Sequence, residues 1–79
     1  MVIAVDSHAI GLVFEAGEVL YAVEVKAASR PDARDVRNLN EFSSPKGLKV
    51  RRVLFYTGED YATVDNVDLI PVAALFRGR

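Results

Sequence analysis

The chain has 79 residues, 51% of them apolar, and a formal net charge of −1. This length fits one small domain over residues 1–79. The charge argues against broad nucleic-acid binding, which usually needs a basic excess. The absence of cysteine excludes disulfides and thiolate zinc sites, and a single histidine excludes a metal site built from histidines. No stretch reaches the roughly 18 apolar residues that cross a bilayer, so we expect a cytoplasmic protein without a membrane segment.

The first part of the chain predicts β-strands. Val2–Val5 is short and β-prone, and we expect it at a sheet edge. Ile10–Glu15 and Glu18–Lys26 follow, with a tight turn at Ala16-Gly17 between them. Two strands around a glycine-containing turn indicate an antiparallel hairpin.

A helix is predicted over about residues 30–43. Ser29 is the expected N-cap, because a side-chain oxygen there can accept a hydrogen bond from the first free backbone N–H groups. Apolar residues then recur at helical spacing, at Val36, Leu39 and Phe42.

Strands dominate again after the helix. Val50–Tyr56 is a strand whose apolar run Val53–Tyr56 predicts burial on both faces. Two short strands follow, Ala62–Val64 and Val67–Ile70, and Val72–Phe76 forms a final helical turn. Because a strand, a helix and a strand follow one another, we expect one parallel pair. The fold class is therefore α/β: a small mixed sheet with an N-terminal antiparallel hairpin and one main helix on one face.

Glu24 and Lys26 are the residues best suited to chemistry. They lie two apart on a strand and so share a face. A carboxylate beside a lysine can bind a divalent cation and activate a water molecule, although a simple ion pair on an exposed hairpin explains the same pattern. The predicted turn pairs Gly11 with Ala22, which makes Gly11 the diagonal neighbour of Glu24. A second acidic ligand would be needed there, and glycine supplies none.

Five segments, in this order and spacing, resemble the PD-(D/E)xK nuclease-like C-terminal domain of bacterial and archaeal AAA-type ATPases: Gly11–Glu15, Ala22–Ala27, Ser29–Asp35, Val53–Glu59 and Leu69–Leu75. The resemblance covers nearly the whole chain beyond residue 9, and it implies a restriction-endonuclease-like core with Glu24 and Lys26 as vestigial catalytic residues. That family's hairpin typically opens Glu-Val-Asp, where this chain has Ala9-Ile10-Gly11. Asp6 and Glu15 are the candidates to replace the lost carboxylates.

A second candidate surface is basic. Lys46, Lys49, Arg51 and Arg52 cluster at the start of a predicted strand and could contact phosphates. The alternative interpretation is that they flank an apolar strand to prevent edge pairing, and this is the one we favour.

Three functions are compatible with these residues. We favour a degenerate nuclease-like module without catalysis, an interaction or assembly domain related to the C-terminal part of an AAA-type ATPase. The alternatives are a metal-dependent nuclease with a rearranged or partner-completed site, and a non-catalytic nucleic-acid-binding module. The favoured function needs no cofactor and leaves room for weak Mg²⁺ or Mn²⁺ binding at most.

The high apolar content predicts a partner, either a second copy in a homodimer or a larger ATPase chain. A chain this short exposes much of its surface, and a large apolar patch on that surface favours association. The expected contact surfaces are the edge strand Val2–Val5 and the apolar C-terminal turn around Val72, Leu75 and Phe76.

Overall fold

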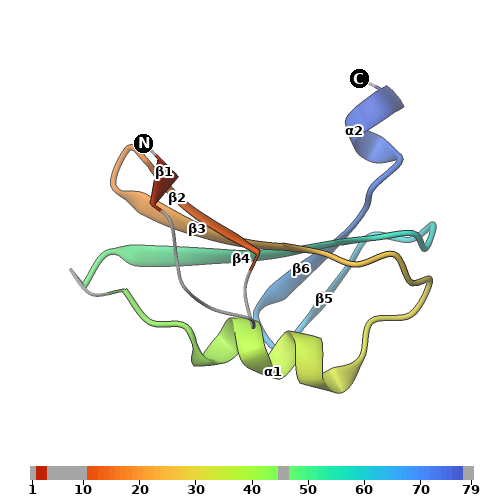
Figure 1. The fold of residues 1–79 in the computed structure, drawn as a ribbon, viewed down its shortest axis with the longest axis horizontal. Helices are drawn as coiled ribbons and strands as arrows, with labels where there is room; N and C mark the ends of the chain where they lie inside the picture. Colours follow the sequence, from red (N-terminus) through yellow and green to blue (C-terminus); the bar gives the residue numbers. More distant parts are fainter. Residues whose placement is uncertain (1, 4–10, 45–46, 78–79) are drawn as a thin grey trace.

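The computed structural model describes residues 2–3, 11–44 and 47–77. Six strands form one mixed sheet in the order β1-β2-β3-β4-β6-β5, with α1 on one side and α2 on the other (Figure 1). Neither helix in these residues is long and apolar enough to cross a membrane. The expected small mixed α/β sheet with one main helix is confirmed. In chain order the elements are β1 (Val2–Ile3), β2 (Leu12–Ala16), β3 (Val19–Val25), α1 (Ala33–Glu41), β4 (Lys49–Tyr56), β5 (Ala62–Val64), β6 (Val67–Pro71) and α2 (Ala74–Arg77).

The hairpin of β2 and β3 turns one residue later than predicted. Ala16 pairs with Val19, so the loop is Gly17-Glu18 and not Ala16-Gly17. Gly17 has a φ of +64°, the left-handed conformation that a two-residue hairpin loop requires at its first position when it forms a type II′ turn. Each residue of β2 therefore pairs two residues further along β3 than predicted. A shift of two leaves every side chain on the face where the prediction put it.

Three parallel strands form the centre of the sheet. β3 pairs with β4 and β4 pairs with β6, both in parallel, and α1 makes the crossover between β3 and β4. The predicted parallel pair is confirmed, and the sheet contains a second one. β5 then pairs antiparallel with β6, through a loop whose Asp65 and Asn66 have φ values of 50° and 69°. Two consecutive left-handed residues are typical of a type I′ hairpin turn.

The N-cap of helix α1 lies three residues later than the predicted one. Asp32 and not Ser29 is the N-cap, and a capping box joins it to Asp35, whose carboxylate accepts a hydrogen bond of 3.1 Å from the Asp32 N–H. The reason is Pro31, because a residue that precedes proline is disfavoured in the helical conformation. Arg30 therefore stays outside the helix, and the capping box of Asp32 and Asp35 sets the start at Ala33.

The hydrophobic core lies between α1 and one face of the sheet. Val36 and Leu39 of α1 are buried and Phe42 packs at its border, as the helical spacing predicts. The buried strand residues alternate along their strands, so they share a single face, which we call the helix face. The core residues are Val13, Leu20, Ala22, Val36, Leu39, Leu54, Tyr56, Val67 and Leu69.

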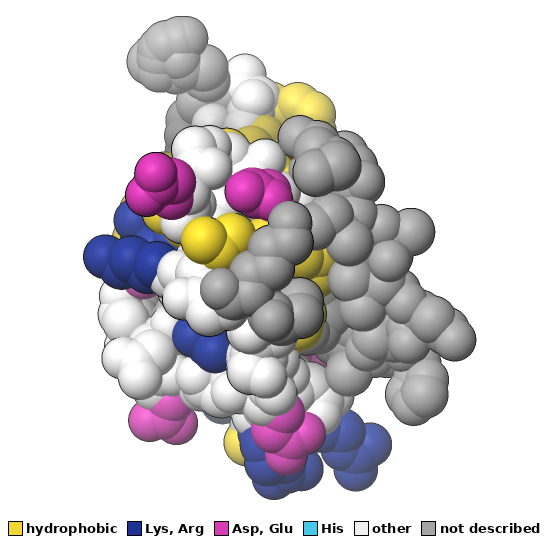
Figure 2. All heavy atoms as spheres, turned by 90° about the vertical axis from the view of Figure 1, so that its left-hand side faces the viewer, with side chains coloured by type: hydrophobic (Ala, Val, Ile, Leu, Met, Phe, Trp, Pro, Cys, Tyr) yellow, Lys and Arg dark blue, Asp and Glu magenta, His cyan; other side chains and the backbone are white. Residues whose placement is uncertain are grey.

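The opposite face of the sheet is also apolar but only partly buried. We call it the open face, and in the described part of the chain α2 is the one helix on that side, where it contacts β6. Figure 2 shows hydrophobic side chains at the surface beside charged ones in its upper half, and further charged side chains at the lower end, where α1 lies. On the open face Val53 and Phe55 of β4 are only partly buried. The predicted burial of β4 on both faces is therefore not found within these residues. The same face carries the polar residues Lys49, Arg51, Thr63 and Asp68. Its larger apolar residues are Leu12, Phe14, Tyr21, Val23, Val25, Val53, Phe55 and Ile70.

Candidate functional site

The Glu24 carboxylate lies near the carboxyl end of β3, on the helix face. Leu12 pairs with Val23, so Gly11 stands directly opposite Glu24 and not diagonal to it as predicted. A Cβ atom at Gly11 would lie 3.4 Å from Oε1 of Glu24. Position 11, just before β2, is therefore a suitable place for a second carboxylate ligand, and glycine offers no side-chain donor atom.

The remaining acidic candidates do not complete a metal site. Glu15 shares a face with Gly11, but it pairs with Leu20, four residues and therefore roughly 13 Å along β3 from Glu24. Asp6 and the Ala9-Ile10 pair lie outside the described residues. Within the described ranges, no three His, Cys, Asp or Glu side chains gather to hold a metal ion. Glu24 alone is a poor fit to Mg²⁺ or Mn²⁺, hard cations that proteins hold through several oxygen ligands.

Lys26, the second residue predicted to be a vestigial catalytic group, forms an ion pair with the helix. Its Nζ lies 3.4 Å from Oδ1 of Asp35, the same carboxylate that closes the capping box of α1. The backbone N–H of Lys26 also donates to the Phe55 carbonyl oxygen, at 2.9 Å. Lys26 thus links the end of β3 to the first turn of α1. This ion pair was not predicted from the sequence, where Asp35 at the third helical position was the available signal.

Arg52, predicted as a phosphate contact, caps the end of α1. Its Nε–H donates to the carbonyl oxygen of Leu39 at 2.8 Å, and Nη2 donates to that of Phe42 at 2.7 Å. The last carbonyl groups of a helix have no partner within the helix and carry partial negative charge. A guanidinium at this position satisfies two of them and holds α1 against β4.

The other basic candidates lie apart from Arg52. Lys49 and Arg51 alternate with Arg52 along β4 and therefore point to the opposite side of the sheet. Nη2 of Arg51 is 3.2 Å from Oδ2 of Asp68, and Lys46 lies outside the described residues. The three described cations thus do not form one surface, and phosphate binding by them stays a prediction.

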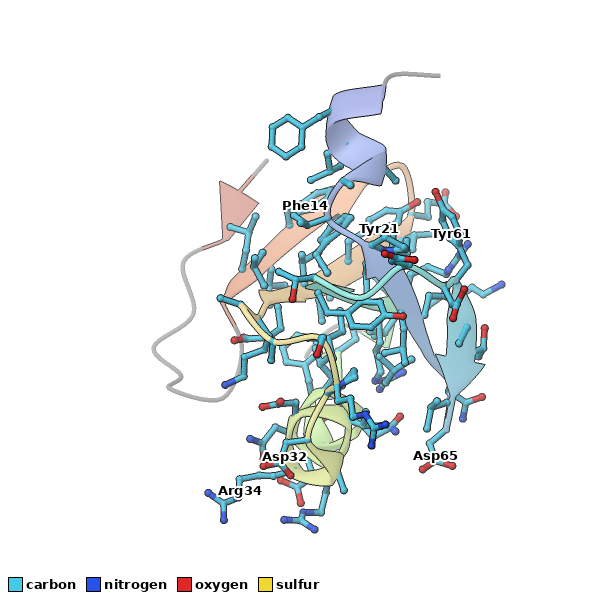
Figure 3. The ribbon with its side chains drawn as sticks, turned by 90° about the vertical axis from the view of Figure 1, so that its right-hand side faces the viewer. Phe14, Tyr21, Asp32, Arg34, Tyr61 and Asp65 are labelled. Atoms are coloured by element: carbon cyan, nitrogen blue, oxygen red, sulfur yellow. The ribbon has the colours of Figure 1, made fainter. Side chains whose placement is uncertain are left out.

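A groove that the sequence analysis missed runs between α1 and the β5–β6 hairpin. Its volume is about 610 Å³, with an apolar floor that includes Val36, Val64 and Leu69 and a rim that carries Asp32 and Arg37. Figure 3 shows Asp32 on α1 and Asp65 at the hairpin turn on the same lower side of the sheet, whereas Phe14 and Tyr21 lie above it. The groove contains no pairing of a nucleophile with a base.

The described residues define a small mixed α/β domain in which β3 ends in Glu24-Val25-Lys26 and position 11, across the hairpin, carries no carboxylate. Residues 6–75 match the family described as a domain of unknown function, DUF4143, and the chain belongs to that family. No curated protein and no solved structure matches the chain.

Proposed function

We propose that this domain is a degenerate nuclease-like module without catalysis, and that it acts as an interaction or assembly domain related to the C-terminal part of an AAA-type ATPase. The observation that carries the proposal is the position of Gly11 beside Glu24, where an added Cβ atom would lie 3.4 Å from Oε1 of the carboxylate. A nuclease of this kind needs two acidic groups at that point to hold its cation. Here the second group is replaced by a hydrogen atom.

The contacts of Lys26 support the same conclusion. A catalytic lysine must reach the attacking water or the phosphate, whereas this one pairs with Asp35 and so with the cap of α1. Its role in the domain is then to join two elements of the fold. Loss of the cation site leaves such a residue with a structural role alone.

The interaction role is supported by the open face. Phe14 and Tyr21 stack there with ring centroids 5.1 Å apart, and Leu12 and Val25 are exposed beside them. Apolar surface that is grouped on one face is typical of a contact site for another protein, whereas single exposed apolar residues are common on any protein.

Calorimetric titration with Mn²⁺ and a cleavage assay test the proposal. We expect no binding at micromolar Mn²⁺, and no cleavage of supercoiled plasmid DNA or single-stranded RNA with Mg²⁺ or Mn²⁺ present. Micromolar Mn²⁺ binding that is lost in Glu24→Ala and kept in the matched control Glu18→Ala would overturn it. So would metal-dependent cleavage with the same dependence on Glu24.

A further inference from the structure

The short helix α2 presents two large apolar side chains to solvent on the same side of the sheet as the open face. Phe76 is 83% exposed and Leu75 is 57% exposed, and α2 follows β6 directly and contacts it. The helix that carries both residues therefore borders the open face. A phenylalanine gains stability when it is buried, and nothing in the described residues buries Phe76.

The strands beneath this surface are of the kind that is normally covered. Parallel strands occur almost only in sheets with both faces packed, usually by helices. β3, β4 and β6 form such a parallel set, and their open-face residues include the aliphatic Val23, Val53 and Ile70, with Arg51 and Asp68 on the same face. In the described chain, α1 supplies one of the two expected layers.

The total surface area of the chain is larger than that expected for a compact monomer. The chain exposes 5377 Å², whereas a compact monomer of its mass is expected to expose about 4,700 Å². The excess of roughly 700 Å² is close to the ~800 Å² that each partner contributes to a standard protein interface. The flat shape, 34 × 29 × 20 Å, agrees with a missing layer.

We propose that the missing layer is a second copy of this chain, related by a two-fold axis, with α2 of each copy lying on the open face of the other. This inference rests on the interaction role of the open face proposed above and names the partner. A two-fold arrangement requires a self-complementary surface. The open side meets this condition, because it offers both the apolar α2 side chains and the apolar sheet that receives them. Arg51 and Asp68 form an ion pair on this side of the sheet. In a two-fold dimer, Arg51 of each copy can pair with Asp68 of the other.

Sedimentation equilibrium at micromolar concentration tests the dimer with three variants. Val25→Lys places a charge on the open face at a position that is 62% exposed, and Phe76→Glu places one on α2. Val64→Lys is the matched control, an exposed valine of β5 that lines the groove on the α1 side. We expect twice the monomer mass of 8.7 kDa for the parent and the control. We expect at least a tenfold weaker association for the two open-face variants, with unchanged circular dichroism.

Three results would overturn the proposal. The first is a parent protein that stays at 8.7 kDa without concentration dependence. The second is a dimer that survives both Val25→Lys and Phe76→Glu, which would then pair along an edge strand such as β1. The third is equal dissociation by Val64→Lys. If the parent protein is monomeric, the dimer proposal is wrong and the proposed non-catalytic function is unaffected. If the protein is a dimer that cleaves nucleic acid with Mn²⁺, the non-catalytic function is wrong and the dimer proposal is unaffected.

Discussion

The helix face and the open face are made by the same strands and are similarly apolar, yet α1 covers one and leaves the other partly exposed. Along β4 the buried residues Leu54 and Tyr56 alternate with the partly buried Val53 and Phe55. The two faces also differ in their polar contacts. On the helix face, Lys26 and Arg52 tie the sheet to the two ends of α1. The contrast shows that apolar residues in a strand identify a surface that favours burial. Which helix or partner covers that surface depends on the rest of the fold or on another chain.

The largest expected effect on the unfolding free energy is the difference between shortening a leucine on the helix face and one on the open face. Leu20 on the helix face is 2% exposed, whereas Leu12 on the open face is 41% exposed. Leu20→Ala should cost about 2–5 kcal/mol of unfolding free energy, because it leaves a cavity under α1. Leu12→Ala should cost about 1 kcal/mol or less at concentrations where the protein is monomeric, because its side chain already faces water in part.

Urea denaturation of the two leucine variants measures this contrast directly. Equal losses would mean that the open face is as well packed within one chain as the helix face. The distinction between the faces would then be wrong.

The next effect concerns the cap supplied by Arg52. Arg52→Met keeps the aliphatic stem but removes the guanidinium bonds to the Leu39 and Phe42 carbonyl oxygens, of which Leu39 keeps the Phe42 N–H as a donor. Charged hydrogen bonds of this kind contribute about 1.5–3 kcal/mol. Arg51→Met is the control on the other face, where an exposed ion pair contributes less than about 1 kcal/mol. Thermal unfolding should show the larger drop for Arg52→Met, and a reversed order would contradict the capping role.

A smaller loss is expected where the turn after β4 approaches the core. A Cβ atom at Gly58 would lie 2.2 Å from Cε2 of Tyr56 and 2.9 Å from the Ser29 carbonyl oxygen. Tyr56 is buried and donates a hydrogen bond to the Asp60 carbonyl oxygen, so it cannot move without loss. Gly58→Ala should therefore cost about 1–3 kcal/mol through overpacking.

Gly11→Ala is the control for this substitution. Its Cβ would meet no atom closer than 3.4 Å, and we expect a loss of less than about 1 kcal/mol in the same urea experiment. A Gly58→Ala variant as stable as Gly11→Ala would show that the turn after β4 can relax.

Much of the fold could be predicted from the sequence, because the elements are marked by local patterns. The spacing of Val36 and Leu39 identified the helix and its buried stripe. The hairpin register was missed because a glycine fits either position of a two-residue loop, and the side-chain pattern is the same after a shift of two residues. The late start of α1 could have been predicted from Pro31, which was a stronger signal than Ser29.

The candidate site was predictable only as far as it lies within one hairpin. Gly11 and Glu24 were expected on one face because strand alternation survives the register error. The contacts of Lys26 and Arg52 depend on where α1 docks against the sheet, and no local pattern specifies that position. The partners of the candidate phosphate-binding residues could therefore be identified only after the structure showed on which face each residue lies.

NMR spectra recorded during a Mn²⁺ titration test the central claim most directly, because the paramagnetic ion broadens signals only near its binding site. For the parent protein we predict no selective broadening around Gly11 and Glu24 at equimolar Mn²⁺. Gly11→Asp restores a second carboxylate beside Glu24 and is expected to introduce local broadening there. Selective broadening at Gly11 and Glu24 in the parent protein, abolished by Glu24→Ala, would contradict the account.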